Sequence, residues 1–412
     1  DLPRHSPDSA QRPLPQNTAQ NSGPALDRPL LARRVTVLHF PRFSMERWLR
    51  AAQRRGEEFP DDLAIALAVE GAHGPVIHAT NRAAEQQGVQ IGSRVVDMRA
   101  LCPDLHLDFA DTRADLAALD RLVLWARRWC PWTARDGDRG IVMDTTGSDH
   151  LLGGEAAMLR EIEERLSALG LSSTLAVAPT HGAAWALARF GTAREICAAP
   201  DLPQRMARLP VKALRLTGDT VLLLQRLGLK TVGDLAAVPR LSLARRFSRA
   251  PLAENPLLRL DQMMGRLAEP ISAPEDPPRF AVRSRLAEPV QDPTAWLPDL
   301  CLELCGGMAA AGYGARRLRV TVYRTDGEVS WAEVATARPS RDASHLRRLF
   351  DGKLDRIDPG FGFDLITLSA TVVEKLQTIQ TRLDRQADDG AELGKLVDRL
   401  TARLGGGALR MP

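Results

Sequence analysis

The sequence has few of the features that mark secreted, membrane-spanning or zinc-binding proteins. Its five cysteines are an odd number at unpaired spacings, which predicts buried thiols in a reducing compartment rather than disulfides or a zinc site. No run of about 18 apolar residues occurs, so no segment is predicted to span a membrane. The first residues lack the apolar core of a secretory signal. We therefore expect a cytoplasmic protein.

Several catalytic signatures are missing as well. There is no Gly-rich loop ending in Lys-Ser/Thr, no His-Glu-x-x-His and no Gly-x-Ser-x-Gly. We therefore expect no cofactor and no metal ion. His181 follows a predicted helix cap at Thr180, where a structural hydrogen-bonding role is favoured over a role as a base.

Size and charge leave room for several domains and for an anionic partner. The 412 residues allow two to four domains, and 44% of them are hydrophobic. The net charge of +4 permits a nucleic-acid partner without demonstrating one.

The pattern of apolar residues divides the chain. Residues 1–33 are polar and are predicted to be disordered. Strands then alternate with helices up to about residue 204, which is typical of an α/β domain. The predicted strands are 35–40, 62–70, 74–79, 140–144 and 175–178, and the predicted helices are 44–55, 82–87, 112–129, 155–169 and 180–191.

The second half changes character. Residues 205–270 read as short helices, and Pro277-Pro278 marks a linker. Strands at 317–323, 329–336 and 363–373 with a helix at 343–355 predict an α+β module. The tail, 376–412, contains one predicted helix, 391–404.

The segment Leu227–Leu235 reads as a helix, a tight glycine turn at Gly228 and a second helix, which is a helix-hairpin-helix pattern. Such a turn directs backbone N–H groups at a phosphate, and Lys230 and Thr231 supply further donors. A plain helical hairpin is the alternative interpretation.

The order of these modules resembles the Y-family (UmuC/DinB-like) DNA polymerases. Several segments resemble one subgroup, the catalytically inactive ImuB-type proteins of bacterial mutasomes. The segments that carry the resemblance are 88–89, 98–103, 144–147, 150–155, 180–191, 265–266, 269–271 and 357–362.

The resemblance implies a multidomain α/β and α+β fold with the right-hand architecture of that family. Its parts would be a palm, fingers, a helical thumb with the helix-hairpin-helix, and a little finger. The implied boundaries are palm 34–70 and 106–204, fingers 71–105, thumb 205–272, little finger 278–375 and tail 376–412.

Active family members hold two metal ions with carboxylates from two strands, because magnesium prefers oxygen ligands. On the first strand the matching positions are His39 and Pro41, with Arg42 beside them. On the second strand they are Arg139 and Gly140, although a one-residue shift would bring in Asp138. The resemblance therefore implies degenerate metal positions.

The nucleotide positions are also changed. Active members grip the triphosphate with a Tyr and an Arg of the fingers, and the matching positions are Arg82 and Glu85. A glutamate beside phosphate is repulsive. Together with the metal positions, this predicts an inactive polymerase fold.

Basic residues in the C-terminal half remain candidates for contacts with DNA. Alternation in 317–323 places Leu318, Val320 and Val322 on one face and Arg317 and Arg319 on the other. An arginine at every second position suits a phosphate backbone, although a merely solvated face has the same pattern. Arg279, Arg283 and Arg285 repeat it in an earlier segment.

ImuB-type proteins are expected to carry a sliding-clamp peptide after the little finger. Gln380 and Leu383 have suitable spacing, but Asp384 and Arg385 stand where an aromatic residue or a second leucine should follow. An ordinary linker is the alternative.

The predicted function is that of a noncatalytic component of the SOS mutasome. It would bind damaged or primer-template DNA and the sliding clamp, and recruit an error-prone replicative-type DNA polymerase with an ImuA-type protein for translesion synthesis and induced mutagenesis. Two alternatives stay open: an active translesion polymerase with unusual metal ligands, and a simple helix-hairpin-helix DNA-binding protein.

Overall fold

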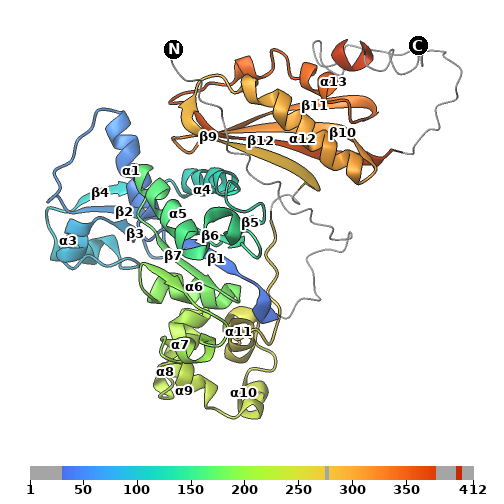
Figure 1. The fold of residues 1–412 in the computed structure, drawn as a ribbon. Helices are drawn as coiled ribbons and strands as arrows, with labels where there is room; N and C mark the ends of the chain where they lie inside the picture. The colour runs from blue at the N-terminus through green and yellow to red at the C-terminus, as the bar shows by residue number, and fades with distance from the viewer. Residues whose placement is uncertain (1–29, 274–277, 377–395, 401–412) are drawn as a thin grey trace, which may run out of the picture. The chain divides into compact units, whose positions relative to one another are not determined.

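The computed structural model describes residues 30–273, 278–376 and 396–400, which fall into two compact units. The N-terminal unit is built mainly from residues 28–277, and the C-terminal unit mainly from residue 278 onward. The break falls between Pro277 and Pro278, the two prolines that predict a linker. The α/β and α+β multidomain class is confirmed (Figure 1).

A five-stranded sheet forms the centre of the N-terminal unit. Its strand order is β5-β6-β1-β7-β8, and β1 pairs antiparallel with both β6 and β7. Its middle position explains why Val35, Val37 and Leu38 are fully buried. The strands are β1 (Val35–His39), β5 (Thr133–Arg135), β6 (Gly140–Asp144), β7 (Thr174–Ala178) and β8 (Arg194–Ile196), and the adjoining helices are α4 (Thr112–Ala126), α5 (Glu155–Ala168) and α6 (His181–Phe190).

A separate three-stranded sheet, β3-β2-β4, carries the predicted fingers. Ala66 and Ala68 face a small core with α2 and α3, whereas Ile65 and Leu67 pack towards Met45 of α1. The elements are α1 (Phe43–Arg54), β2 (Ile65–Val69), β3 (Val76–Thr80), α2 (Arg82–Gln86), α3 (Val95–Leu101) and β4 (His106–Phe109).

This sheet contains strands from both sides of the predicted boundaries between palm and fingers. The strand at 62–70 was expected in the palm, and the segment from 106 onward as well. In the structure β2 pairs with β3 and β4, not with β1. The apolar run in β2 fits a buried strand of either sheet, so the sequence pattern alone does not choose the pairing.

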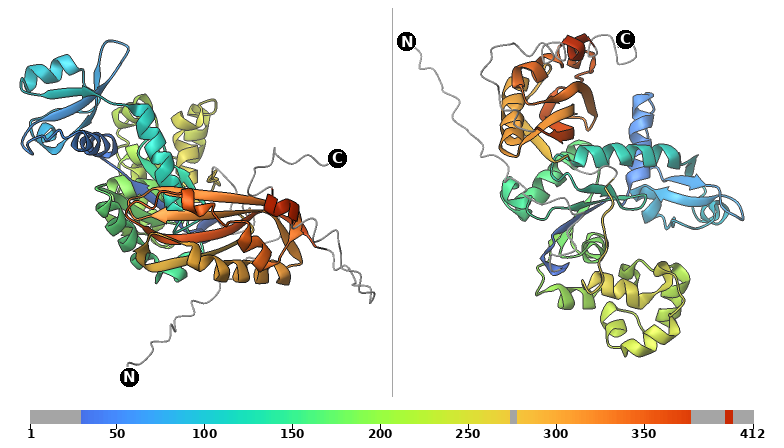
Figure 2. Two further views of the ribbon diagram at one scale, coloured as in Figure 1. Left: turned by 90° about the horizontal axis from the view of Figure 1, so that it is seen from above. Right: turned by 90° about the vertical axis from the view of Figure 1, so that its right-hand side faces the viewer.

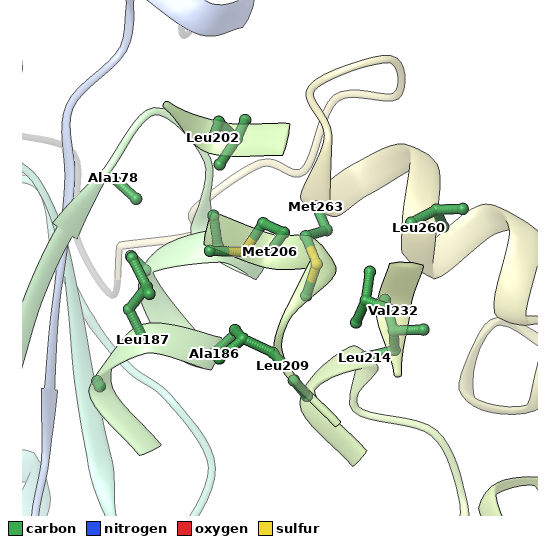
Figure 3. Packing of buried hydrophobic residues seen from close by; sticks show 14 of the residues in the cluster. Ala178, Ala186, Leu187, Leu202, Met206, Leu209, Leu214, Val232, Leu260 and Met263 are labelled. Carbon is green, nitrogen blue, oxygen red and sulfur yellow. The ribbon is translucent and has the colours of Figure 1, made fainter. Parts of the chain in front are cut away.

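Short helices follow the five-stranded sheet and share its core. Ala186 and Leu187 of α6 pack in one cluster with Met206, Leu214 and Met263 from the helical region (Figure 3). The predicted palm and thumb are therefore joined by one hydrophobic core. The helices are α7 (Leu202–Ala207), η3 (Val211–Leu214), α8 (Gly218–Arg226), α9 (Val232–Ala236), α10 (Arg240–Arg246), η4 (Leu252–Glu254) and α11 (Pro256–Met263).

The C-terminal unit is a four-stranded antiparallel sheet in the order β11-β10-β12-β9. Its helices α12 and α13 pack on one face, against Leu318, Val320 and Val322 of β10. Figure 2 shows the unit from two further directions. Its elements are β9 (Phe280–Val290), η5 (Thr294–Trp296), α12 (Leu297–Ala310), β10 (Tyr313–Arg324), β11 (Val329–Ser340), α13 (Ala343–Arg348), η6 (Leu354–Arg356) and β12 (Phe363–Lys375).

The ends of the chain differ in part from the predictions. Residues 30–33 were expected to be disordered, but a 3-10 turn, η1 (Leu30–Ala32), precedes Arg33, which pairs with Asp144. Residues 1–29 lie outside the described chain. Of the predicted tail helix 391–404, the described residues 396–400 are helical, and Asp398 is buried at 2.9 Å from Nε2 of His345.

Candidate functional site

The predicted metal-binding positions lie together at one end of the five-stranded sheet. His39, the last residue of β1, is paired with Gly140, the first residue of β6. The backbone N–H of Phe40 donates to the carbonyl of Arg139 at 2.8 Å, and Nδ1 of His39 lies 3.2 Å from the same oxygen. Pro41 follows directly and is exposed. The two strand ends are therefore adjacent. None of the four positions, His39, Pro41, Arg139 and Gly140, supplies a carboxylate.

Asp144 lies at the opposite end of the same strand pair. It is paired with Val35, four residues from His39 along β1, which corresponds to about 13 Å. Its carboxylate accepts hydrogen bonds from Arg33 at 2.7 Å and from the hydroxyl of Thr146. Asp144 therefore stabilises the start of β1 and lies too far away to join a metal site at His39.

The surroundings of His39 disfavour a positive charge. Burial, and after it the charges of Arg189 and Arg139, lower the pKa of His39 from 6.5 to about 4, although the Arg139 carbonyl and Asp136 act in the opposite direction. Groups that repel a proton at this place repel a divalent cation more strongly, because Coulomb energy scales with charge. The His39 imidazole is neutral at pH 7.

The carboxylate beside this strand end, Asp136, is already paired. It comes from the turn between β5 and β6, and its Oδ2 would lie 3.2 Å from a Cβ added at Gly140. Oδ1 lies 3.2 Å from Nε2 of His181, and Oδ2 accepts from Arg189 at 3.4 Å. Burial opposes ionisation, but the His181 hydrogen bond and the charges of His181 and Arg189 outweigh it and lower the pKa of Asp136.

His181 links Asp136 to a second partly buried carboxylate. Its Nδ1 lies 3.5 Å from Oε1 of Glu269, whose other oxygen accepts from Arg215 at 2.7 Å. Arg259 adds a further contact with Glu269 at 3.7 Å. We refer to Asp136, His181, Arg189, Arg215, Arg259 and Glu269 as the palm–thumb network.

The palm–thumb network was largely missed by sequence reasoning. The structural hydrogen-bonding role expected of His181 is confirmed. Its acidic partners lie 45 and 88 positions away in the sequence, so no local spacing reveals them. The one available signal was Glu269-Pro270, which carried part of the family resemblance.

In the predicted fingers, Glu85 forms a salt bridge with Arg42, which lies just after β1. Glu85 in α2 accepts from Arg42 at 2.9 Å, and its second oxygen lies 3.3 Å from the hydroxyl of Thr80. Arg82 begins the same helix and is exposed. The Arg42–Glu85 pair joins the segment after β1 to the fingers and engages the carboxylate at one of the two predicted nucleotide positions.

The predicted helical hairpin is present, but its backbone donors are occupied. Gly228 has φ +83° and ends α8, as a glycine after a helix commonly does. The N–H groups of Lys230 and Thr231 both donate to the carboxylate of Asp234, at 3.0 and 2.8 Å. These two N–H groups are therefore engaged within the turn, and contact of the hairpin with a phosphate stays a prediction. The exposed side chain of Lys230 remains available.

In the C-terminal unit, the alternation predicted for β10 is mostly confirmed. Leu318, Val320 and Val322 are fully buried, and Arg317 is exposed. Tyr323 was expected on the outer face with the arginines, but it is 5% exposed.

The other predicted arginines have identifiable surroundings. Arg279 donates to the hydroxyl of Tyr313 at 2.7 Å and lies over its ring, and Arg319 donates to Glu333 at 2.7 Å. Arg283 and Arg285 pair with Thr367 and Leu365 of β12, in register with the outer residues of β10.

Three further observations concern the described residues alone. No group of three or more His, Cys, Asp or Glu side chains among them is arranged to hold a metal ion. None of their helices is long and apolar enough to cross a membrane. The predicted clamp residues Gln380 and Leu383 lie outside the described chain.

Comparison with known proteins identifies relatives. A family model described as the impB/mucB/samB family matches residues 51–189. Protein ImuB of Caulobacter vibrioides, from strains NA1000 / CB15N and ATCC 19089 / CIP 103742 / CB 15, is 42% identical over 339 residues, with 77% of this chain and 69% of the relative covered.

Among solved structures, DinB from Sulfolobus solfataricus is 14% identical with a TM-score of 0.48. An insertion ternary complex of Dbh DNA polymerase is 15% identical with a TM-score of 0.49. Each match covers 84% of this chain and 100% of the other chain. On the extent and identity of the match to the Caulobacter proteins, the chain belongs to the ImuB family.

Proposed function

We propose that this protein is a noncatalytic, polymerase-like DNA-binding component of a bacterial mutasome. The observation that carries the proposal is the pairing of His39 with Gly140, which brings the two predicted metal-binding strand ends together without a carboxylate at any of the four expected positions. Hard cations such as magnesium need such oxygens.

The charges around these strand ends support the same proposal. Asp136 is engaged by His181 and Arg189, and Arg139 adds a positive charge next to His39. In the fingers, Glu85 is held by Arg42. A triphosphate with its metal ions would meet positive charge where the metal ions should bind, and the Glu85 carboxylate where the phosphates should bind.

Two surfaces support DNA binding by the inactive fold. The helical hairpin exposes Lys230, and the outer face of the C-terminal sheet carries Arg317, Arg319, Arg283 and Arg285, with Arg279 just before β9. Contacts of this kind position a protein on a phosphate backbone without reading its sequence. Damaged or primer-template DNA is the proposed substrate class.

The remaining partners follow from family membership. We assign the protein to SOS-induced mutagenesis in the cytoplasm, where it would bind the sliding clamp through Gln380 and Leu383. It would recruit an error-prone replicative-type polymerase together with an ImuA-type protein, and that polymerase would perform translesion synthesis.

Primer extension tests the absence of catalysis. We expect the full chain to shift a primer-template in a binding assay and to add no nucleotide with Mg²⁺ or Mn²⁺. Template-dependent extension that disappears in folded Asp138→Ala or Asp144→Ala protein would show an active polymerase with unusual ligands and overturn the proposal.

A clamp pull-down tests the scaffold role. We expect the wild-type chain to retain the clamp and the double variant Gln380→Ala, Leu383→Ala to lose it, with Thr378→Ala as a neutral neighbour. Retention of DNA binding without any association with clamp or polymerase would favour a simple helix-hairpin-helix DNA-binding protein.

A further inference from the structure

One aromatic side chain on the outer face of the C-terminal sheet is not explained by packing. Trp331 lies on β11, the edge strand, and is 51% exposed. Val334 and, in part, Ala332 of the same strand pack into the core. Because side chains alternate along a strand, the indole of Trp331 lies on the opposite face. Exposed apolar residues that stand singly are common, so the residues beside Trp331 decide whether it has a role.

A salt-bridged arginine and two hydroxyl side chains lie near Trp331 on this face. The guanidinium of Arg319 lies 5.7 Å from the centre of the indole ring and is held by Glu333, at 2.7 Å. Directly across from Trp331 is Thr321 on β10, and directly across from Thr321 is Thr367 on β12. Both threonines are partly exposed.

This cross-strand row runs the full width of the sheet. Trp331, Thr321, Thr367 and Arg283 follow one another from the edge strand β11 to the edge strand β9. Three strand spacings make the row about 14 Å long. An aromatic ring thus stands at one end, short hydroxyl side chains in the middle, and an arginine at the other end.

We propose that Trp331 is a stacking platform for an unpaired nucleotide, with Arg319 beside it to contact the adjoining phosphate. The inference rests on the proposed DNA binding and names the class of nucleic acid that this face prefers, a single strand. Small four-stranded sheets bind single strands in this way, by stacking bases on aromatic residues of an open face.

The preference for an unpaired nucleotide follows from the geometry of the base. In a duplex both faces of each internal base are covered by its neighbours, so an indole on a sheet meets only the edge of the helix. An unpaired base offers its face, and stacking on it is insensitive to sequence because every base has one. Trp331 therefore adds affinity for single strands that the arginines alone do not supply.

Glu333 limits the strength of this site. Its carboxylate pairs with Arg319 on the same face, next to Trp331, and opposes a phosphate there. It also fixes the guanidinium beside the indole. The geometry thus fits transient binding of a single strand rather than tight retention.

Equilibrium titration of the full chain with two labelled probes tests the proposal. The probes are an oligothymidylate and a blunt duplex of the same length, and the variants are Trp331→Ala and Trp331→Phe. Phe361→Ala is the matched control, because Phe361 is 80% exposed in the loop before β12 and lies outside the sheet. Thermal unfolding confirms that each variant is folded.

We expect Trp331→Ala to weaken oligothymidylate binding about tenfold and duplex binding less than about twofold, with Trp331→Phe close to wild type. Phe361→Ala should change neither. Equal losses on both probes, or no loss on oligothymidylate while the wild type binds DNA, would overturn the stacking role alone. If the wild type binds neither probe at low salt, the proposed DNA binding fails and the stacking role with it.

Discussion

The five-stranded sheet and the C-terminal sheet hold their charged side chains in opposite ways. At the β1–β6 end of the five-stranded sheet, acidic and basic side chains are turned inward and bond to one another, as Asp136 does with His181 and Arg189. On the outer face of the C-terminal sheet, Arg317 is exposed and Trp331 half-exposed. In the first region the charged groups are paired with one another, whereas the second presents polar side chains to solvent. The difference agrees with the proposal of a fold that has no working nucleotide site and binds DNA through the C-terminal sheet.

The first region should be the more sensitive to loss of a charge. Replacing Glu269 by Ala leaves the partly buried Arg215 and Arg259 without their carboxylate, and we expect a loss of about 2–3 kcal/mol in the free energy of unfolding. Urea unfolding monitored by circular dichroism measures it. Glu254→Ala, the same change at an exposed position, should stay within about 0.5 kcal/mol. Equal effects would mean that the palm–thumb network does not stabilise the fold.

Titration offers a second way to test the β1–β6 end of the five-stranded sheet. The pKa of His39 is about 4 in the folded protein, below the ordinary 6.5, so the unfolded chain binds the proton first as pH falls. Stability from this group is complete above pH 6.5 and is lost as pH falls towards 4. The wild type should therefore lose about 2 kcal/mol more stability between pH 7 and pH 4.5 than His39→Gln does. His73→Gln, at an exposed site, should lose as much as the wild type does.

Substitutions on the outer face of the C-terminal sheet should change DNA binding rather than the stability of the fold. Arg317→Ala should weaken duplex binding by about 1 kcal/mol and lower the salt dependence by about one counterion. Arg348→Ala is the control, because this exposed arginine lies on α13, which packs on the other face of the sheet. Anisotropy titrations at several salt concentrations measure both. A larger loss in the control would place the binding surface on the helical side.

The smallest effect is expected at the helical hairpin. Asp234 occupies the N–H groups of Lys230 and Thr231, and its pKa is lowered by those backbone bonds. Asp234→Ala frees both donors and removes a negative charge, so DNA binding should tighten by about twofold to threefold. Asp219→Ala makes the same charge change on α8 and should have less effect. Weaker binding in Asp234→Ala would mean that the capped turn is the form that contacts DNA.

The sequence predicted most helices and strands because their apolar periodicity is local. The helices at 155–169 and 180–191 were placed within one residue of α5 and α6. Pairing between strands was harder to predict, because the apolar run of β2 fits either sheet of the N-terminal unit. The short strands β4, β5 and β8 were missed, since three or four residues carry too little periodicity to be recognised.

The sequence indicated which positions make up the candidate site, but not which side chains contact one another there. Residues 39, 41, 139 and 140 were implied by the family resemblance, and strand register brings their two segments together. The partners of Asp136, Glu269 and Glu85 could not be predicted, because each arises from tertiary contacts between segments far apart in the sequence. The hydrogen bond from the Thr231 N–H to Asp234 could have been predicted, since Thr-x-x-Asp is a pattern typical of a capped helix start.

The pairing of β1 between β6 and β7 has a consequence for the stability of this strand end. A working metal site gathers like-charged carboxylates at a strand end, and their mutual repulsion lowers stability until metal binds. Here the middle strand keeps its full ladder while His39 and Pro41 occupy that end without repulsion. A fold without carboxylates at these positions avoids that electrostatic cost, so introducing them should lower its stability while no metal is bound.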